Sequence, residues 1–225
     1  EDMINLYFAE GTCDIIMGVP DGFERGLTTL SYYRSPYAIV YRADAGFDIE
    51  SLDDPDLASK VIGIQGLGTP PHVALAQRGL SGNVARIYGG EEGVDDRLGT
   101  LIRAIEVGEV EVGFGWGPVV SYFAERSDSD LVVKPVSPEF EPPNIFQSLP
   151  MTIAVRRNDV ALRDMLNVAI ATRWDEIQGI LAEYRIPLTP ISPAFLGTPF
   201  VNPADVYLEV GVVLPLPTGG RTRLA

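Results

Sequence analysis

The sequence predicts an α/β fold in which strands and helices alternate along the chain. Short apolar runs rich in branched residues, such as residues 61–64 and 151–155, are typical of buried strands. Amphipathic stretches such as residues 95–107 follow them and predict helices. A segment rich in proline and acidic residues, residues 136–150, interrupts this alternation. We therefore expect a mainly parallel sheet and a crossing between two parts of the fold at residues 136–150.

The expected elements are justified by periodicity and by turn residues, and prolines mark the first turns of two helices. In chain order they are a helix over residues 3–10, a strand over 13–19 that is covered on both faces, an extended run over 38–42, a strand over 61–64, a helix from the prolines at 70–71 through 77, a strand over 85–88, a helix over 95–107, a strand over 109–116, a helix over 118–125, a strand over 151–155 and helices over 161–173 and 174–184. Residues 192–225 form a proline-rich extension.

Composition excludes several classes of partner and site. A formal net charge of −14 would repel nucleic-acid phosphates. The same charge suits docking on a basic protein, and solubility alone explains it equally well. No apolar run reaches the ~18 residues that a membrane-spanning helix needs, and the first residues lack the pattern of a signal peptide. Because Cys13 and His72 are the only residues of their kinds, the sequence argues against a zinc site of nitrogen and sulfur ligands. The acidic pairs Glu91-Glu92 and Asp95-Asp96 lack the spacing of an EF-hand loop, and we expect no metal site and no cofactor.

Five motifs occur in a fixed order over about residues 11–184. They are a D-x-x-x-G strand at Asp14 to Gly18, the pair Glu24-Arg25, the run Tyr33-Arg34-Ser35-Pro36-Tyr37, the glycine-rich turn Gly66-Leu67-Gly68-Thr69 with the later strand Gly108 to Gly117, and the run Ile153-Ala154-Val155-Arg156 with Asp159. Together they resemble the type II solute-binding proteins, which capture amino acids and other small solutes for transporters. The resemblance implies a first lobe of residues 1–37 and 151–191, a second lobe of residues 38–150 and two crossings between them.

Several short segments of the sequence are similar to those of a narrower family. Residues 13–20 and 32–37, together with Trp116-Gly117-Pro118 and the following Tyr122-Phe123-Ala124, resemble the MxaJ/XoxJ proteins. Those are periplasmic binding proteins encoded beside PQQ-dependent methanol dehydrogenases, some of them lanthanide-dependent. The resemblance implies a periplasmic, non-enzymatic accessory protein that assists maturation or activation of the dehydrogenase through a wide cleft between the lobes. The alternative is a transporter-type receptor for a small anionic or apolar solute.

Two features depart from the wider family. The strand and helix with which the family begins would precede Glu1, so we expect a first lobe with an incomplete sheet and a more open cleft. The resemblance gives Cys13 a disulfide partner on that strand, and the alternative is a small buried thiol. Relatives that bind amino acids hold the ligand ammonium with an acid, and that position falls at Trp116. Since a buried ammonium without a counter-charge costs several kcal/mol, we expect no amino-acid ligand.

The candidate ligand residues are Arg25, Gly68, Thr69, Trp116 and Tyr37. Arg25 lies where relatives bind a carboxylate, but a surface ion pair with a neighbouring acid is an equal alternative. The turn at Gly68 and Thr69 precedes a helix, where an anion can bind, or Thr69 simply caps that helix. Trp116 and Tyr37 line the cleft or pack in the core and hinge.

The predicted hinge lies at the two crossings between the lobes. Its residues are Pro36, Tyr37 and Ala38 on the first crossing and Leu149 and Pro150 on the second.

Overall fold

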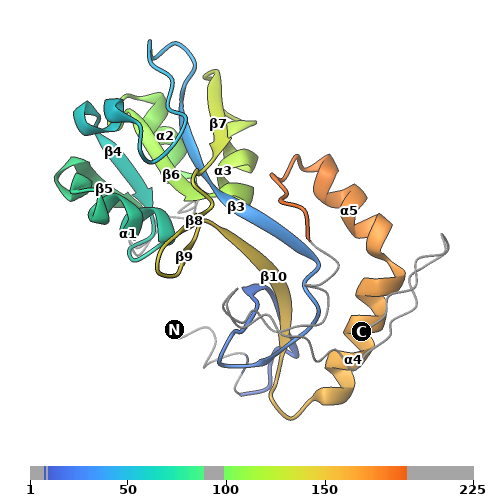
Figure 1. The fold of residues 1–225 in the computed structure, drawn as a ribbon. Coiled ribbons are helices and arrows are strands. Elements are labelled where there is room, and N and C mark those ends of the chain that lie inside the picture. The colour runs from blue at the N-terminus through green and yellow to red at the C-terminus, as the bar shows by residue number, and fades with distance from the viewer. Residues whose placement is uncertain (1–7, 9, 89–98, 192–225) are drawn as a thin grey trace. The chain divides into compact units, whose positions relative to one another are not determined.

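The computed structural model describes residue 8, residues 10–88 and residues 99–191 (Figure 1). The extension at residues 192–225, most of the predicted helix at 3–10 and the first part of the predicted helix at 95–107 lie outside the described residues. The chain divides into two compact units. Unit 1 consists of Glu1–Arg34, Leu149–Glu183 and Leu188–Ala225, and unit 2 consists of Ser35–Ser148 and Tyr184–Pro187.

The described strands are β1 Ile15–Pro20, β2 Leu27–Thr28, β3 Tyr33–Arg42, β4 Ile62–Gln65, β5 Val84–Tyr88, β6 Val112–Trp116, β7 Leu131–Pro135, β8 Phe140–Glu141, β9 Ile145–Phe146 and β10 Ser148–Val155. The helices are α1 Pro70–Gln77, α2 Thr100–Glu106, α3 Gly117–Ala124, α4 Val160–Thr172 and α5 Trp174–Glu183, with short 3-10 turns at Pro55–Ser59 and Leu80–Asn83.

The sheet of unit 2 has the strand order β7, β3, β6, β4, β5. Strand β4 runs parallel to both β5 and β6, as the alternation of strands and helices predicts. Strand β3 is antiparallel to both of its neighbours, β6 and β7. The prediction of a mainly parallel sheet is therefore wrong for β3. The direction of β3 follows from its place on the chain, because it enters unit 2 as the first crossing and not through a βαβ connection.

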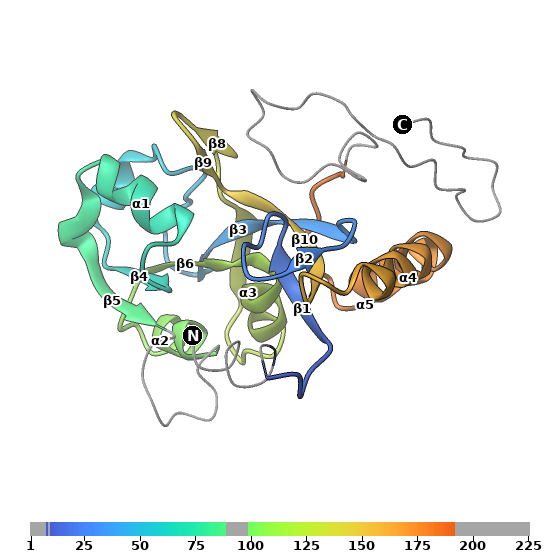
Figure 2. The ribbon, with the colours of Figure 1, turned by 90° about the horizontal axis from the view of Figure 1, so that it is seen from below.

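Both faces of this sheet are covered, and β3 shows how. Ile39 and Tyr41 pack into one apolar cluster with α1, whereas Ala38 and Val40 pack into a second cluster with α2 and α3. Successive side chains of a strand point to opposite faces, so one strand serves both clusters. Figure 2 shows α1 on one side of the strands and α2 and α3 on the other.

Unit 1 is organised around β10, which has β1 on one side and β2 on the other, both antiparallel. Strand β1 lies at an edge among the described strands, and its Met17 side chain is 62% exposed. The prediction that this strand is covered on both faces is therefore wrong. An apolar, branched composition identifies a strand, but it does not distinguish a central strand from an edge strand. Helices α4 and α5 complete the described part of the unit (Figure 1).

The sequence motifs of unit 1 bind to one another. Asp14 accepts two hydrogen bonds of 3.1 Å from Arg156, which follows β10, and Arg157 donates to the backbone oxygen of Glu24. The register of β1 against β10 shifts at Gly18, which has a φ of +72°. A bulge with positive φ favours glycine, since a Cβ would strain it. The D-x-x-x-G and I-A-V-R motifs thus encode the pairing of β1 with β10.

The two crossings lie beside each other at both of their ends. In unit 1 the Tyr32 N–H donates to the Met151 oxygen at 3.0 Å, and in unit 2 the Tyr37 N–H donates to the Gln147 oxygen at 2.6 Å. The predicted crossing segment at 136–150 differs from the structure, because most of it forms the hairpin β8–β9 and only its end belongs to β10. Proline content marks a break in the alternation but does not reveal a hairpin that pairs only two residues on each side.

The chain also makes a short return to unit 2 that the two predicted crossings do not include. Tyr184–Pro187 belongs to unit 2, between α5 and the last described residues of unit 1. Arg185 forms an ion pair with Glu125 at 3.0 Å, and the Pro187 oxygen accepts from the Ser35 hydroxyl at 2.5 Å. Within the described ranges, no helix is long and apolar enough to cross a membrane.

Candidate functional site

The candidate site lies at the carboxyl edge of β4 and β6 in unit 2. These strands are parallel, so their carboxyl ends share one edge of the sheet. Helix α1 begins a short turn after β4, and α3 follows β6 without a break. In open α/β sheets, ligands bind in front of the carboxyl ends of the strands and near the N-termini of the helices that follow. The sheet therefore brings Gly68, Thr69 and Trp116 to the kind of edge where such folds bind ligands.

Gln65, the last residue of β4, joins the two strand ends. Its side-chain oxygen accepts a hydrogen bond of 3.0 Å from the Trp116 N–H. The turn after it is held by two further bonds. The Thr69 hydroxyl donates to the Gly66 oxygen at 3.1 Å, and the Gly68 N–H donates to Nδ1 of His72 at 3.0 Å. The turn is therefore shaped by its own side chains, and in neutral His72 the ring proton must sit on Nε2.

Tyr37 and Trp116 form the aromatic part of the site. They are register partners on β3 and β6, and their rings meet edge to face with centroids 5.1 Å apart. Tyr37 also packs against the apolar cluster beneath α1, and burial raises the pKa of its hydroxyl above the usual value. Trp116 is half-buried. The Trp116 ring thus packs on Tyr37 while a portion of the residue remains accessible, and its place in the wall of a cleft stays a prediction.

Gly117 allows the first turn of α3 to lie against the first crossing strand. A Cβ placed on Gly117 would come within 2.3 Å of the Pro36 oxygen and 2.9 Å of the Pro187 ring. No side chain can be accommodated against a backbone oxygen at that distance. Glycine at this position is thus what brings the end of β6 and the start of α3 close to the first crossing.

The structure corrects the helix-capping alternative for Thr69. Thr69 precedes α1, but its side chain makes no capping hydrogen bond and instead binds back to the turn. The anion alternative also loses support, because the first two helical residues, Pro70 and Pro71, have no N–H to offer. Gly68 adopts a φ of +75°, and its N–H is already used by His72. The turn therefore offers an anion few free backbone donors.

One predicted ligand residue, Arg25, does not belong to this edge. Arg25 is exposed and belongs to unit 1, between β1 and β2, so its grouping with the residues of unit 2 stays a prediction. The unit boundaries fall at Arg34/Ser35 and Ser148/Leu149.

The predicted hinge residues lie within or beside these boundaries. Pro36, Tyr37 and Ala38 are within β3, and Leu149 and Pro150 are within β10. Ala38 is paired on both sides, with β6 and with β7. Their role as a hinge stays a prediction.

Cys13 is exposed, so the alternative of a buried thiol is wrong. In the residues the structure describes, no group of three or more histidine, cysteine or acidic side chains could hold a metal ion.

Sequence reasoning missed two residues of this region. Gln65 is one, since only the parallel pairing of β4 and β6 shows that its amide reaches the backbone of Trp116. Gln147 is the other. Its side chain is completely buried, and neither its Nε2 nor its Oε1 has a hydrogen-bond partner among the residues that the structure describes. Its backbone oxygen accepts from Tyr37, which places it beside the aromatic pair. A glutamine in a proline-rich segment carries no signal of burial.

Unit 2 also has a cavity lined by other residues. It has a volume of about 490 Å³ and is lined by α3, β7 and the return segment, including Glu125, Asp130 and Arg185. None of the predicted ligand residues lines it. It is therefore not the site that the sequence motifs predict.

The chain was compared with protein families, with curated proteins and with solved structures. No family model matches the chain. It is 29% identical over 192 residues to Protein MoxJ of Methylorubrum extorquens AM1, a match that covers 80% of this chain and 64% of MoxJ. The chain thus spans just under two thirds of that relative.

Two solved structures have a similar fold. The crystal structure of MxaJ from Methlophaga aminisulfidivorans MPT gives a TM-score of 0.70 at 23% identity, covering 84% of this chain and 81% of that one. The periplasmic binding protein XoxJ from Methylobacterium extorquens AM1 gives 0.65 at 27% identity, covering 81% and 78%. These similarities confirm the α/β binding-protein fold predicted from the sequence motifs.

Proposed function

We propose that this chain, which is an MxaJ/XoxJ-like type II periplasmic binding protein, acts in the periplasm as an accessory protein of a PQQ-dependent methanol dehydrogenase. It would assist maturation or activation of the dehydrogenase, including lanthanide-dependent forms, and we assign it no reaction of its own. The two predicted lobes would present the contact surface, with the hinge at the two crossings.

The observation that carries this proposal is the chemistry at the end of β6. The resemblance to amino-acid-binding proteins implies an acid at this position, whereas here it is Trp116, packed on Tyr37. The described side chains placed at this edge, Gln65, Thr69, His72, Tyr37 and Trp116, include no carboxylate. An ammonium group would find no counter-charge among them, and desolvating it there would be costly. An aromatic surface is better suited to a protein side chain, since tryptophan and tyrosine are enriched at interface centres.

A second function is favoured by Gln147. A buried amide with two unpartnered atoms can donate to one ligand atom and accept from another. This supports a receptor for a small solute, in which the Nε2 of Gln147 would donate to an anionic group beside Tyr37. Such a receptor would use the same fold without the dehydrogenase.

The accessory function is tested by reconstitution. Purified dehydrogenase apoenzyme is incubated with PQQ, with and without the chain, and the rate at which methanol-oxidising activity appears is measured. We expect the chain to raise this rate and Trp116→Ala to reduce the effect about tenfold, in line with the loss of an interface anchor. Trp174→Ala is the matched control, because it changes the other tryptophan, which is also half-buried but lies in unit 1. If the unaltered chain leaves the rate unchanged, the accessory function is wrong.

A thermal-shift screen separates the two functions. A ligand at about 100 times its dissociation constant stabilises a protein by about 2.7 kcal/mol. For a domain of this size that corresponds to a rise in Tm of roughly 5–10 °C. The accessory function predicts no such rise with common amino acids or small anions. A rise with a small anion that Gln147→Leu abolishes would instead establish the solute receptor.

A further inference from the structure

We propose that the β8–β9 hairpin of unit 2 is a docking element for a protein partner whose contact surface is basic. The inference rests on the proposed function and adds to it the surface that makes the contact.

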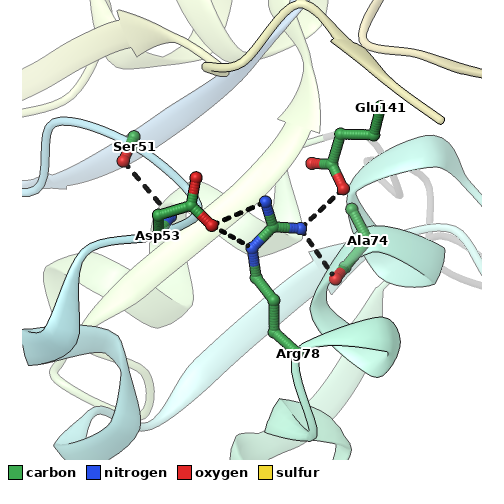
Figure 3. A network of polar contacts seen from close by, with 5 residues as sticks. All are labelled: Ser51, Asp53, Ala74, Arg78 and Glu141. Carbon is green, nitrogen blue, oxygen red and sulfur yellow. Dashed lines mark hydrogen bonds and ion pairs between the residues drawn. The ribbon is translucent and has the colours of Figure 1, made fainter.

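The hairpin is fixed to the body of unit 2 by a buried ion pair (Figure 3). Arg78, at the end of α1, donates from Nη1 to Glu141 of β8 at 2.6 Å, and the Glu141 side chain is only 9% exposed. The same guanidinium binds Asp53 at 2.8 Å and the Ala74 oxygen at 3.2 Å. Removing Arg78 would leave the Glu141 carboxylate buried without its cation, at a cost far above that of a surface pair. The hairpin is therefore held at a defined place on α1.

Backbone contacts hold the stem of the hairpin as well. The Leu52 N–H donates to the Ser137 oxygen at 2.8 Å, and the Gln147 N–H donates to the Glu139 oxygen at 2.8 Å. The hairpin forms its own two-stranded sheet, separate from the main sheet of the unit. It is thus a projection that contacts within unit 2 hold in place.

Phe140 is the apolar contact that this projection presents. Its ring stacks on Phe146 with centroids 4.8 Å apart, yet 43% of the residue remains exposed. Rigid, partly exposed aromatic side chains are the usual anchors of protein interfaces, because little conformational freedom is lost when they bind. The buried ion pair beneath the hairpin supplies this rigidity.

The charge around Phe140 identifies the kind of partner. The hairpin segment at residues 136–150 and the neighbouring segment at 43–59, which hydrogen-bonds to it, contain eight acidic residues and no lysine or arginine. Among the described residues, four cationic side chains are seen to reach these segments from elsewhere, namely Arg42, Lys60, Arg78 and Lys134. The surface stays negative, and so does the whole chain, at −14. A basic protein surface is attracted to it, whereas nucleic acid and anionic lipid are repelled.

The experiment measures binding of the chain to methanol dehydrogenase holoenzyme by biolayer interferometry at two salt concentrations. Phe140→Ala should weaken binding at least tenfold, and Phe140→Tyr, which keeps the ring, should weaken it less than threefold. Tyr122→Ala is the matched control, since Tyr122 of α3 is an aromatic residue of the same unit with a similar exposure of 38%. It should bind like the unaltered chain. Raising NaCl from 50 to 500 mM should weaken binding several-fold, because salt screens charge attraction.

A second variant keeps the test independent of the packing of Phe140. Asn144, in the exposed turn of the hairpin, can be changed without touching the ring stack or the ion pair. Asn144→Arg should weaken binding about threefold or more at low salt, because it places a positive charge against a basic surface.

The outcomes separate the two proposals. If the chain binds the dehydrogenase but Phe140→Ala and Asn144→Arg bind equally well, the hairpin proposal is overturned and the accessory function stands. If binding becomes stronger as the salt concentration rises, the proposal that the partner surface is basic is wrong. If the unaltered chain does not bind at all, both the accessory function and the hairpin proposal fall.

Discussion

The two units differ in how completely their described residues bury apolar side chains. The largest fully buried side chains, Tyr41 and Phe114 among them, all lie in unit 2. Unit 1 exposes Met17 on β1, Met165 on α4 and Ile180 on α5, each by more than half. Among the described residues of unit 2, the large apolar residues exposed by more than half, Leu67 and Val107, lie outside its strands and helices. Unit 2 has helices on both faces of one sheet, whereas β1 of unit 1 lies at an edge among the described strands. Unit 2 is thus the better-defined scaffold, and it carries both the candidate site and the hairpin.

This difference implies that truncating a buried apolar side chain of unit 2 lowers the stability of the protein strongly, whereas truncating an exposed one of unit 1 lowers it little. Phe114 of β6 is completely buried in the cluster beneath α1. Phe114→Ala should destabilise the protein by about 3–5 kcal/mol, the sum of lost burial and of the cavity left behind. Met165→Ala removes a side chain that is 62% exposed, and its effect should stay within about 0.5 kcal/mol. Urea unfolding monitored by circular dichroism measures both, and similar losses would contradict the difference between the units.

The elements of both units could be predicted where local signals define them. Helices α1, α3, α4 and α5 begin and end within a residue or two of the predicted bounds, because prolines, a capping aspartate and apolar periodicity mark them. Asp159 illustrates this, since its side chain accepts from the Leu162 N–H. Strand β7 was missed because it pairs with β3, which lies far away in the chain. The hairpin was missed because it pairs only two residues on each side, which is too short for a periodic pattern.

The candidate site could be predicted only in part. Tyr37 and Trp116 were predicted as site residues, and the pairing of β3 with β6 brings them together. Gln65 was missed because its role depends on the spatial adjacency of two strands that lie some fifty residues apart. The assignment of an anion to Thr69 overlooked that prolines at the next two positions remove the donors such a site needs.

Two glycine substitutions, one in each unit, test the same difference, and we expect their effects on stability to be of intermediate size. Gly117 starts α3 of unit 2, and a Cβ there meets the backbone oxygen of Pro36 at 2.3 Å. Gly117→Ala should destabilise the protein by about 2–3 kcal/mol, as overpacking against a rigid backbone does. Gly179 lies in α5 of unit 1 with nothing within 4 Å of a Cβ, so Gly179→Ala should stabilise by about 0.5–1 kcal/mol. Thermal melts of the two variants should therefore move in opposite directions, and a stabilised Gly117→Ala would show that the close approach is not needed.

The smallest effect concerns charge at the surface of unit 2. Lys134 of β7 binds Asp48 and Glu50, both at 2.5 Å. The hydrogen bond that Lys134 donates to the Asp48 carboxylate holds the pKa of Asp48 below its usual value and raises the pKa of Lys134. A carboxylate with a depressed pKa in the folded state stabilises the protein above its unfolded pKa of about 3.9, and this contribution is lost as the pH falls through the folded value.

Lys134→Met should consequently be less stable than the unaltered chain at pH 7, and the difference should shrink below about pH 4 as Asp48 is protonated. Arg173→Met is the control in unit 1, where the guanidinium and its partner Glu176 are both largely exposed. Such a pair contributes little at any pH, so this variant should follow the unaltered chain throughout. Urea midpoints measured from pH 2.5 to 7 give both curves. A Lys134→Met curve parallel to that of the unaltered chain would mean that the Asp48 carboxylate gains nothing from Lys134 on folding.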